Sequence, residues 1–467
     1  MKNSSPNSVQ QNSRNVMFLC KVICVVLQVG LFAACWEAMQ PYIKIYAQTS
    51  LLLLVIYTLV LVWFHRTYTC LYVGNTKVVT LCTGQLLSLM ISDATLFMLA
   101  TLSIRHLPSI PVFILMFILQ VMVSVLWCFL ANKIYYSITP AQKAAIVHYR
   151  EADLQRVLDI CHEKNHYEVI STIDVNSLTA SISDILTQLE EADVVFLGNV
   201  PPYLQERILH HCTERYQPVI IRPTFYSMAL SNAHHQFLSH TPTLEIAAST
   251  PPALHSFVKR AMDITVSALL LLVASPVMGI VALIVHHQDG GPALFRQKRL
   301  TKDGKVFEIL KFRSMRVDAE KDGVARLATQ NDNRITPIGK FIRATRLDEL
   351  PQLWNILKGD MSLVGPRPER PEIAEQYSRE IPEFNTRLQV KAGLTGYAQV
   401  HGKYNSTPQD KLLMDLMYIS SQSIAQDIKL ILQTIQIMLK KDSTEGVAEG
   451  QSTALAAKKG SSRNHSA

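Results

Sequence analysis

Charged residues are scarce in this sequence: Asp, Glu, Lys and Arg account for 18% of the 467 residues, whereas hydrophobic residues account for 48%. No Cys-X-X-Cys spacing occurs among the eight cysteines, six of which lie in or beside the apolar N-terminal region. The scarcity of charge indicates a membrane protein. The cysteine pattern argues against a zinc site and a disulfide framework, and it fits a reducing cytoplasmic setting.

The net charge is nevertheless +8. In a chain with long apolar spans, Lys and Arg usually mark the cytoplasmic flanks and attract anionic headgroups. We therefore expect membrane lipid, and no nucleic acid, as the partner of this charge. No internal repeat is present, and the length predicts two or three domains.

Four apolar blocks follow a polar segment, residues 1–15, for which we predict disorder. The blocks cover residues 16–36, 50–64, 81–104 and 110–131, and each approaches or reaches the roughly 20 residues that a helix needs to cross a bilayer. We assign residues 16–135 to four transmembrane helices. A signal peptide is the alternative for the first block, but no clear cleavage site follows it. Lys and Arg near the span ends place both the N-terminus and the chain after the fourth helix in the cytoplasm.

Residues 144–248 alternate between strand-like and helix-like segments. AAIVHY, YEVISTIDV, ADVVFLG and QPVIIRP are typical of short buried strands, which predicts a Rossmann-like α/β module. The first strand runs into HYREADLQ without a GxGxxG motif, so a backbone approach to a pyrophosphate is disfavoured. We favour a structural or regulatory role for this module over cofactor binding.

A further apolar run, residues 264–285, is long enough to span, but a crossing would put the rest of the chain outside the cell. Ser275 and Pro276 lie in its middle, where proline breaks the helical hydrogen bonding and serine satisfies part of the freed backbone. We expect a re-entrant helix, with a kinked spanning helix as the alternative. Its expected basic anchors are Lys259, Arg260, Arg296, Lys298 and Arg299.

The region after this run is basic and of mixed α/β character, and the tail, residues 442–467, is predicted to be disordered. QKRLTKDGKVFEILKFRSM indicates a β-hairpin that turns at Asp303 and Gly304. TPIGKFIRATRL and DELPQLWNILKG indicate two helices.

In the second of these helices, Asp348 stands where an N-cap belongs and Pro351 falls in the first turn. Its expected apolar face consists of Leu350, Leu353, Trp354 and Leu357. A capping role is sufficient for Asp348 taken alone.

The surroundings of Asp348 suggest chemistry as well. Together with Glu349 it forms a carboxylate pair of the kind that holds Mg²⁺ alongside substrate phosphates. Cationic residues that could bind phosphate are Arg343, Arg346, Arg367, Lys311 and Arg313. Any single one of them is more often solvated or lipid-facing in a cytoplasmic membrane protein.

Four stretches carry a family resemblance: FRQKR, KFRSM, TRLDELPQLWNILKGDMSLVGPRPERPE and KAGLTGYAQVHGK. Over residues 256–441 the chain resembles the catalytic domain of the bacterial polyprenyl-phosphate sugar-1-phosphate transferases, the monotopic phosphoglycosyltransferases. Four spans followed by an α/β module resemble the large branch of this family, which initiates O-antigen, capsule or exopolysaccharide synthesis.

The resemblance implies a membrane protein with a four-helix transmembrane region, a Rossmann-like α/β module and a C-terminal mixed α/β catalytic domain with a re-entrant membrane helix. It also implies transfer of a sugar-1-phosphate, with hexoses preferred, from a UDP-sugar to undecaprenyl phosphate, at the cytoplasmic face of the bacterial inner membrane. Asp348 corresponds to the nucleophile and Glu349 to the Mg²⁺-associated residue. Arg343 and Arg367 correspond to phosphate contacts, and Ser275 with Pro276 to the helix break.

One position departs from the family, because many members carry a Gly-Arg pair where this chain has Gly402 and Lys403. Two rival functions remain: a membrane-anchored nucleotide-sugar oxidoreductase or epimerase, and a non-enzymatic polysaccharide assembly scaffold or regulator. The architecture also suggests a homodimer formed through the α/β module.

Overall fold

The computed structural model describes residues 6–39, 47–74, 76–164, 166–176, 182–231, 233–246, 252–317, 319, 332, 334–402 and 406–438. The chain forms two compact units, Met1–Arg222 and Pro223–Ala467. Residues 1–5 and 442–467, for which we predicted disorder, lie outside the described residues.

Four long helices open the first unit: α1 (Pro6–Met39), α2 (Ala47–Thr67), α3 (Val78–Ile104) and α4 (Ile110–Ile138). Helix α1 begins at Pro6, so residues 6–15 are helical where we predicted disorder. Once an apolar stretch has formed a helix, extending that helix by one residue costs little free energy, because each added residue forms one new backbone hydrogen bond. Among the described residues, α1 to α4 and the later helix α9 are long and apolar enough to cross a membrane. They indicate a membrane protein.

Polar side chains join the helices of this bundle. The Gln28 Nε2 donates to the Gln85 Oε1 at 2.9 Å and to the Ser124 Oγ at 2.8 Å, and the Tyr57 hydroxyl donates to the Asp93 Oδ1 at 2.9 Å. Hydrogen bonds of this kind between apolar helices contribute about 0.6 to 2 kcal/mol each. They fix the register of α1 to α4.

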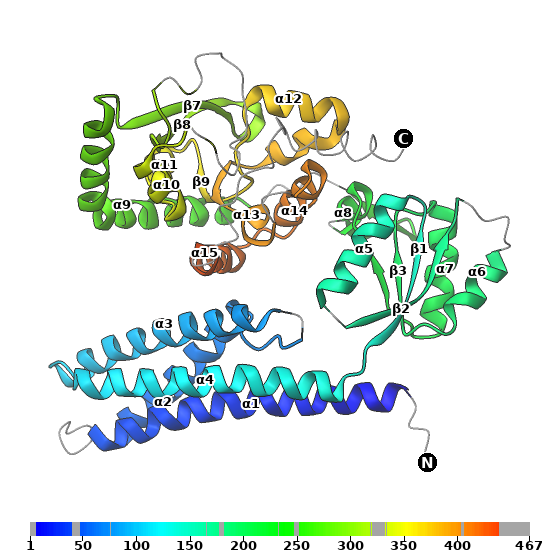
Figure 1. Cartoon of the computed structure of the whole chain (residues 1–467), viewed down its shortest axis with the longest axis horizontal. Helices are drawn as coiled ribbons and strands as arrows, with labels where there is room; N and C mark the ends of the chain where they lie inside the picture. Colours follow the sequence, from blue (N-terminus) through cyan, green and yellow to red (C-terminus); the bar gives the residue numbers. More distant parts are fainter. Residues whose placement is uncertain are drawn as a thin grey trace. The chain divides into compact units, whose positions relative to one another are not determined.

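The α/β module contains the four strands expected from the sequence: β1 (Gln142–His148), β2 (Tyr167–Asp174), β3 (Val194–Leu197) and β4 (Val219–Ile221). They form a parallel sheet in the order β2-β1-β3-β4. Alternate residues pack on α5 (Glu151–Lys164) on one face and on α6 (Ile182–Leu189) and α7 (Pro202–Glu214) on the other. Figure 1 shows these helices on both sides of the sheet. The module is therefore a small doubly wound α/β fold.

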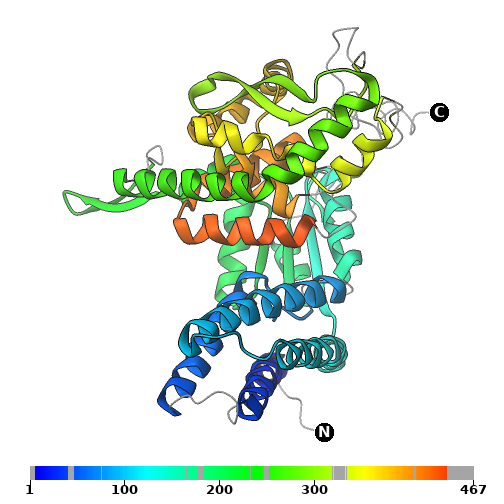
Figure 2. The ribbon, with the colours of Figure 1, turned by 90° about the vertical axis from the view of Figure 1, so that its left-hand side faces the viewer.

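The second unit opens with α8 (Phe225–Ser231), a hairpin of β5 (His234–Leu238) and β6 (Thr241–Glu245), and the long helix α9 (Ala253–Asp289). Figures 1 and 2 show α9, drawn in green, bending sharply between its two halves. Pro276 has no N–H to offer to the carbonyl of Leu272, and the Ser275 hydroxyl donates to that carbonyl at 2.8 Å instead. Serine thus satisfies the backbone group that proline frees, as predicted from the sequence.

After α9 comes the predicted hairpin, β7 (Leu294–Leu300) and β8 (Val306–Phe312), with Asp303 in the left-handed conformation at its turn. The other elements are α10 (Pro337–Ala344), the 3₁₀ turns η2 (Leu347–Glu349) and η3 (Pro382–Gln389), α11 (Gln352–Lys358), β9 (Ser362–Val364), α12 (Pro371–Glu380), β10 (Gly393–Thr395), α13 (Tyr397–His401), α14 (Pro408–Ser420) and α15 (Ile424–Met438). Most of their apolar faces enclose one core, which includes Leu353, Ile356, Leu363 and Tyr377. Ile342 of α10 packs instead in a smaller cluster with Val285 of α9 and Phe312 of β8.

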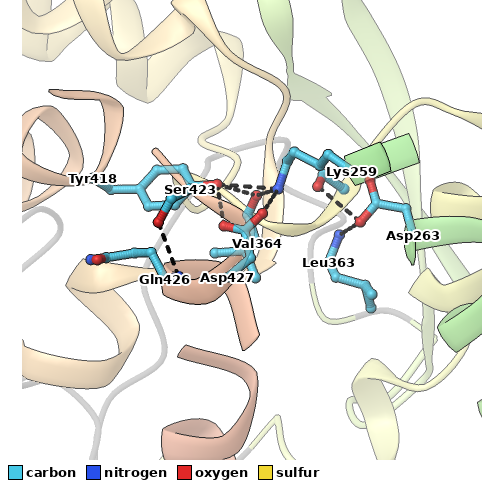
Figure 3. A network of polar contacts seen from close by, with 9 residues as sticks. Lys259, Asp263, Leu363, Val364, Tyr418, Ser423, Gln426 and Asp427 are labelled. Carbon is cyan, nitrogen blue, oxygen red and sulfur yellow. Dashed lines mark hydrogen bonds and ion pairs between the residues drawn. The ribbon is translucent and has the colours of Figure 1, made fainter. Parts of the chain in front are cut away.

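The first turns of α9 are fastened inside this core (Figure 3). The Lys259 ammonium contacts Asp427 at 2.5 Å and donates to the Val364 carbonyl at 3.2 Å, and the Asp263 carboxylate accepts from the Leu363 N–H at 2.9 Å. These bonds attach α9 to β9 and α15.

Arg260 donates to the carbonyls of Ile356 and Leu357, at 2.6 and 2.7 Å, near the end of α11. Our expectation that Lys259 and Arg260 anchor α9 to lipid headgroups is therefore wrong. Both side chains bind protein groups, because buried carboxylates and helix-end carbonyls lie within their reach.

Candidate active site

The carboxylate pair lies in a tight turn between two helices. Asp348 and Glu349 occupy the 3₁₀ turn η2, which follows α10 and precedes α11, and Arg346 enters it with a left-handed φ of 58°. Pro351 is the residue at the N-cap of α11, and Asp348 makes no capping hydrogen bond. The predicted cap at Asp348 is therefore wrong, because the left-handed residue delays the helix by one turn.

The same delay changes the buried face of α11. Leu353 is 1% exposed, but Trp354 is 59% exposed, contrary to the predicted apolar face. Asn355 is buried instead, and its side chain accepts from the Leu310 N–H at 3.0 Å and donates to the Glu308 carbonyl at 2.8 Å. These bonds to β8 hold α11, and with it the turn η2, at the edge of the hairpin.

Cationic groups surround the Glu349 carboxylate. The Lys311 ammonium and the Arg367 guanidinium each donate to its Oε1 at 2.9 Å, and an Arg346 nitrogen lies 3.9 Å from its Oε2. Burial alone would raise the pKa of Glu349, but Lys311, Arg367 and Arg346 together hold that pKa well below its usual range. Glu349 is therefore an anion at neutral pH.

Asp348 lies beside this cluster, but its pKa is shifted in the opposite direction from that of Glu349. Burial and the neighbouring negative charge of Glu349 raise its pKa, while Lys311, Arg343 and Arg367 partly oppose the rise. Within the described part of the chain no hydrogen bond to the Asp348 carboxylate is formed, so its oxygens are open to an incoming group. A carboxylate that is poorly solvated and only partly compensated is a better nucleophile than one held in a tight ion pair.

The structure brings together six of the candidate residues and leaves one apart. One electrostatic environment is shared by Asp348, Glu349, Lys311, Arg343, Arg346 and Arg367. Arg313 instead pairs with Asp289 at the end of α9 and donates to the Val285 carbonyl at 3.2 Å, with only 8% of its surface exposed. Its proposed role in phosphate binding is therefore not supported, and Lys403 lies outside the described residues.

The loop that carries Arg367 is held through its backbone. The Pro366 carbonyl accepts from the Gly393 N–H at 2.9 Å, and the Arg367 carbonyl accepts from the Arg387 guanidinium at 2.9 Å. The Pro368 carbonyl accepts from Arg299 at 3.0 Å. Sequence reasoning missed the contribution of Arg387 and assigned Arg299 to lipid, since no local pattern marks these long-range bonds.

Glycine is required where this loop leaves β9. A Cβ on Gly365 would lie 2.3 Å from the Lys391 carbonyl oxygen, and one on Gly393 would lie 2.1 Å from the Gly365 nitrogen. The two strands approach each other so closely that only glycine fits at either position. The GPRP and AGLTG stretches therefore form one rigid support behind Arg367.

The donor set at η2 suits a hard cation. No group of three or more His, Cys, Asp or Glu side chains suited to a metal occurs among the described residues. Mg²⁺, however, is commonly bound by one or two carboxylates together with substrate phosphates. The adjacent carboxylates of Asp348 and Glu349, which lie among the cationic side chains of Lys311, Arg343 and Arg367, fit that pattern.

Comparison with known proteins places this site in a defined family region. The profile described as bacterial sugar transferase matches residues 254–441, which include the turn η2 and the Arg367 loop.

Three curated relatives show the range of similarity. The chain is 37% identical over 235 residues to the UDP-glucose:undecaprenyl-phosphate glucose-1-phosphate transferase of Escherichia coli K12, covering 49% of this chain and 50% of that protein. It is 36% identical over 256 residues to the undecaprenyl-phosphate galactose phosphotransferase of Salmonella typhimurium, covering 51% and 52%. It is 39% identical over 206 residues to the UDP-glucose:undecaprenyl-phosphate glucose-1-phosphate transferase of Caulobacter vibrioides, covering 43% and 77%. The chain spans about half the length of the first two of these relatives.

Proposed function

Since the chain belongs to the bacterial sugar transferase family, we propose that it transfers a sugar-1-phosphate from a UDP-sugar to undecaprenyl phosphate and releases UMP. The observation that carries this proposal is the pair at η2, in which Glu349 is fixed as an anion by three cations while Asp348 is left open. The product would initiate synthesis of an extracellular polysaccharide, capsule or O-antigen.

The first half-reaction forms a covalent intermediate on Asp348. Its carboxylate attacks the β-phosphorus of the UDP-sugar, the bond from that phosphorus to the bridging oxygen breaks, and UMP leaves with the bonding electrons. The product is an aspartyl phosphosugar. Arg367, Arg343 and Lys311, whose positive charges act on Asp348, stabilise the negative charge that develops on the phosphate oxygens.

In the second half-reaction, a phosphate oxygen of undecaprenyl phosphate attacks the same phosphorus, and the Asp348 carboxylate leaves. This step restores the enzyme and forms undecaprenyl-diphospho-sugar. Mg²⁺, when bound, would be held by Asp348 and Glu349 and would supply charge neutralisation to the diphosphate.

The sugar is proposed only as a class. The relatives are named for glucose, galactose and N-acetylgalactosamine, and of these we propose a hexose such as glucose or galactose. The homodimer remains a prediction from architecture.

We also propose that α9 enters and leaves the inner membrane on its cytoplasmic side and that the catalytic domain lies on that side. The bend at Pro276 and the strongly exposed apolar side chains Leu272, Val273 and Leu283 on α9 support this topology. A variant with the native cysteines replaced and a cysteine introduced at exposed Asp303 tests it. An impermeant thiol reagent should label this cysteine only after the inner membrane is opened, and labelling of intact spheroplasts would reject the topology.

The decisive experiment follows UMP release from the purified full chain with Mg²⁺, undecaprenyl phosphate and a panel of UDP-sugars. The wild-type protein should release UMP with at least one donor, and Asp348→Asn should abolish release while remaining folded. Asp303→Asn, at an exposed turn, is the matched control and should stay active. Retained activity in Asp348→Asn would favour a non-enzymatic role for the pair, and inactivity of the wild type with every donor would reject the proposed reaction.

A further inference from the structure

A buried ion pair lies directly behind the loop of Arg367. Arg387, in η3, is 4% exposed and Asp415, in α14, is 1% exposed, and their side chains meet at 2.6 Å. The Arg387 guanidinium also lies 3.7 Å from Glu369 and 5.0 Å from the centre of the Phe384 ring. Its position is therefore fixed by contacts with Asp415, Glu369 and Phe384.

The same guanidinium reaches the active-site loop. Its Nη2 donates to the Arg367 carbonyl at 2.9 Å, and Arg367 in turn donates to the Glu349 Oε1 at 2.9 Å. An uninterrupted chain of contacts thus runs from Asp415 through Arg387 and Arg367 to the carboxylate next to the nucleophile.

Stability alone is a poor reason for this arrangement. A buried ion pair costs so much desolvation that apolar residues of similar volume often serve the fold equally well. What an apolar pair would lack is a donor for the Arg367 carbonyl. Arg367 lies between two prolines, which have no N–H to donate. Few hydrogen bonds are therefore left to fix its backbone, and the bond from Arg387 acts on the Arg367 carbonyl itself.

We propose that Arg387, held in place by Asp415, is a positioning residue that orients Arg367 toward Glu349 and the donor phosphates. The inference rests on the proposed function. Among the described residues, Arg387 forms no hydrogen bond or ion pair with Asp348, and it acts only through the Arg367 backbone carbonyl. A displacement of about 1 Å in a group that binds the reacting phosphate costs up to about 100-fold in rate.

The test is a double-mutant cycle on the first half-reaction. The rate of the UMP burst is measured with the full chain in the absence of undecaprenyl phosphate, for the wild type, Arg387→Met, Arg367→Met and the double variant. Arg387→Met should slow the burst by about 10- to 100-fold. If Arg387 acts through Arg367, the double variant should be no slower than Arg367→Met alone. Arg379→Met, which removes an exposed arginine on α12, is the matched control and should leave the burst unchanged.

Each outcome decides the proposal. A double variant whose loss equals the product of the two single losses would overturn it, as would an unchanged burst in Arg387→Met. If Arg387→Met does not fold, the same cycle is run with Arg387→Lys, which keeps the charge but loses the planar fork, and the same criteria apply. Absence of a burst in the wild type would overturn the proposed function and this inference with it, whereas a normal wild-type burst with additive variants overturns only the positioning role.

Discussion

Replacing Lys259 by methionine should strongly destabilise the second unit. The Lys259 ammonium is the cation that contacts the Asp427 carboxylate, which is 1% exposed, and it also donates to the Tyr418 hydroxyl at 3.2 Å. Among the described residues, the carboxylate in Lys259→Met keeps only the Tyr418 hydroxyl as a side-chain donor, at 2.8 Å. Removing one partner of a buried ion pair costs about 3 to 5 kcal/mol.

The lower end of that range applies, because 17% of the Lys259 side chain is exposed and water screens part of the lost interaction. A loss of about 3 kcal/mol corresponds to a fall in Tm of roughly 6 to 12 °C for a unit of this size. Scanning calorimetry of the full chain in lipid particles measures it, with Lys429→Met on the exposed face of α15 as the matched control.

Two results would refute this reasoning. One is a fall in Tm of less than about 3 °C in Lys259→Met. The other concerns the double variant Lys259→Met with Asp427→Leu, which removes both charges and should recover most of the lost stability. If the double variant is as unstable as the single one, the unpaired carboxylate is not the cause.

Three further predictions concern the active site and α9. Lys311→Met removes a positive charge that lowers the pKa of Asp348, so the acid limb of the UMP-release rate against pH should move to higher pH; an unmoved or lowered limb would contradict this. Arg313→Met should lower Tm by a few degrees, because Asp289 and the Val285 carbonyl each lose the guanidinium as a donor, yet leave KM for the UDP-sugar unchanged; a raised KM would restore Arg313 to the phosphate site. Ser275→Ala should cost about 1 to 3 kcal/mol by leaving the Leu272 carbonyl without a donor, whereas Ser275→Thr should retain the wild-type Tm in calorimetry.

The sequence predicted those features that depend on neighbouring residues. The parallel strands of the module, the turn at Asp303 and the bond from Ser275 to the backbone freed by Pro276 all follow from short-range patterns, and all are present. The grouping of Asp348 and Glu349 with Arg367 was also expected, both from the cationic residue types near the pair and from the family resemblance.

Features that depend on distant residues were missed. Arg346 adopts a left-handed conformation that no local propensity indicates, and this displaced the start of α11 and with it the predicted cap. Lys259 and Arg260 resembled lipid anchors because their partners, such as Asp427 and the carbonyl of Ile356, lie about 100 or more residues away in the chain. Binding to such partners leaves no trace in the surrounding sequence.

The attachment of α9 has a practical consequence for any attempt to prepare a soluble fragment. A chain cut after α9 would lose the cation of Asp427, the donor to the last carbonyls of α11 and the acceptor of the Leu363 N–H. The contacted groups of Ile356, Leu357 and Leu363 lie in the chain between the carboxylate pair and the Arg367 loop. Helix α9 is therefore not a tether that can be removed, because the residues that begin it also complete the interior of the second unit.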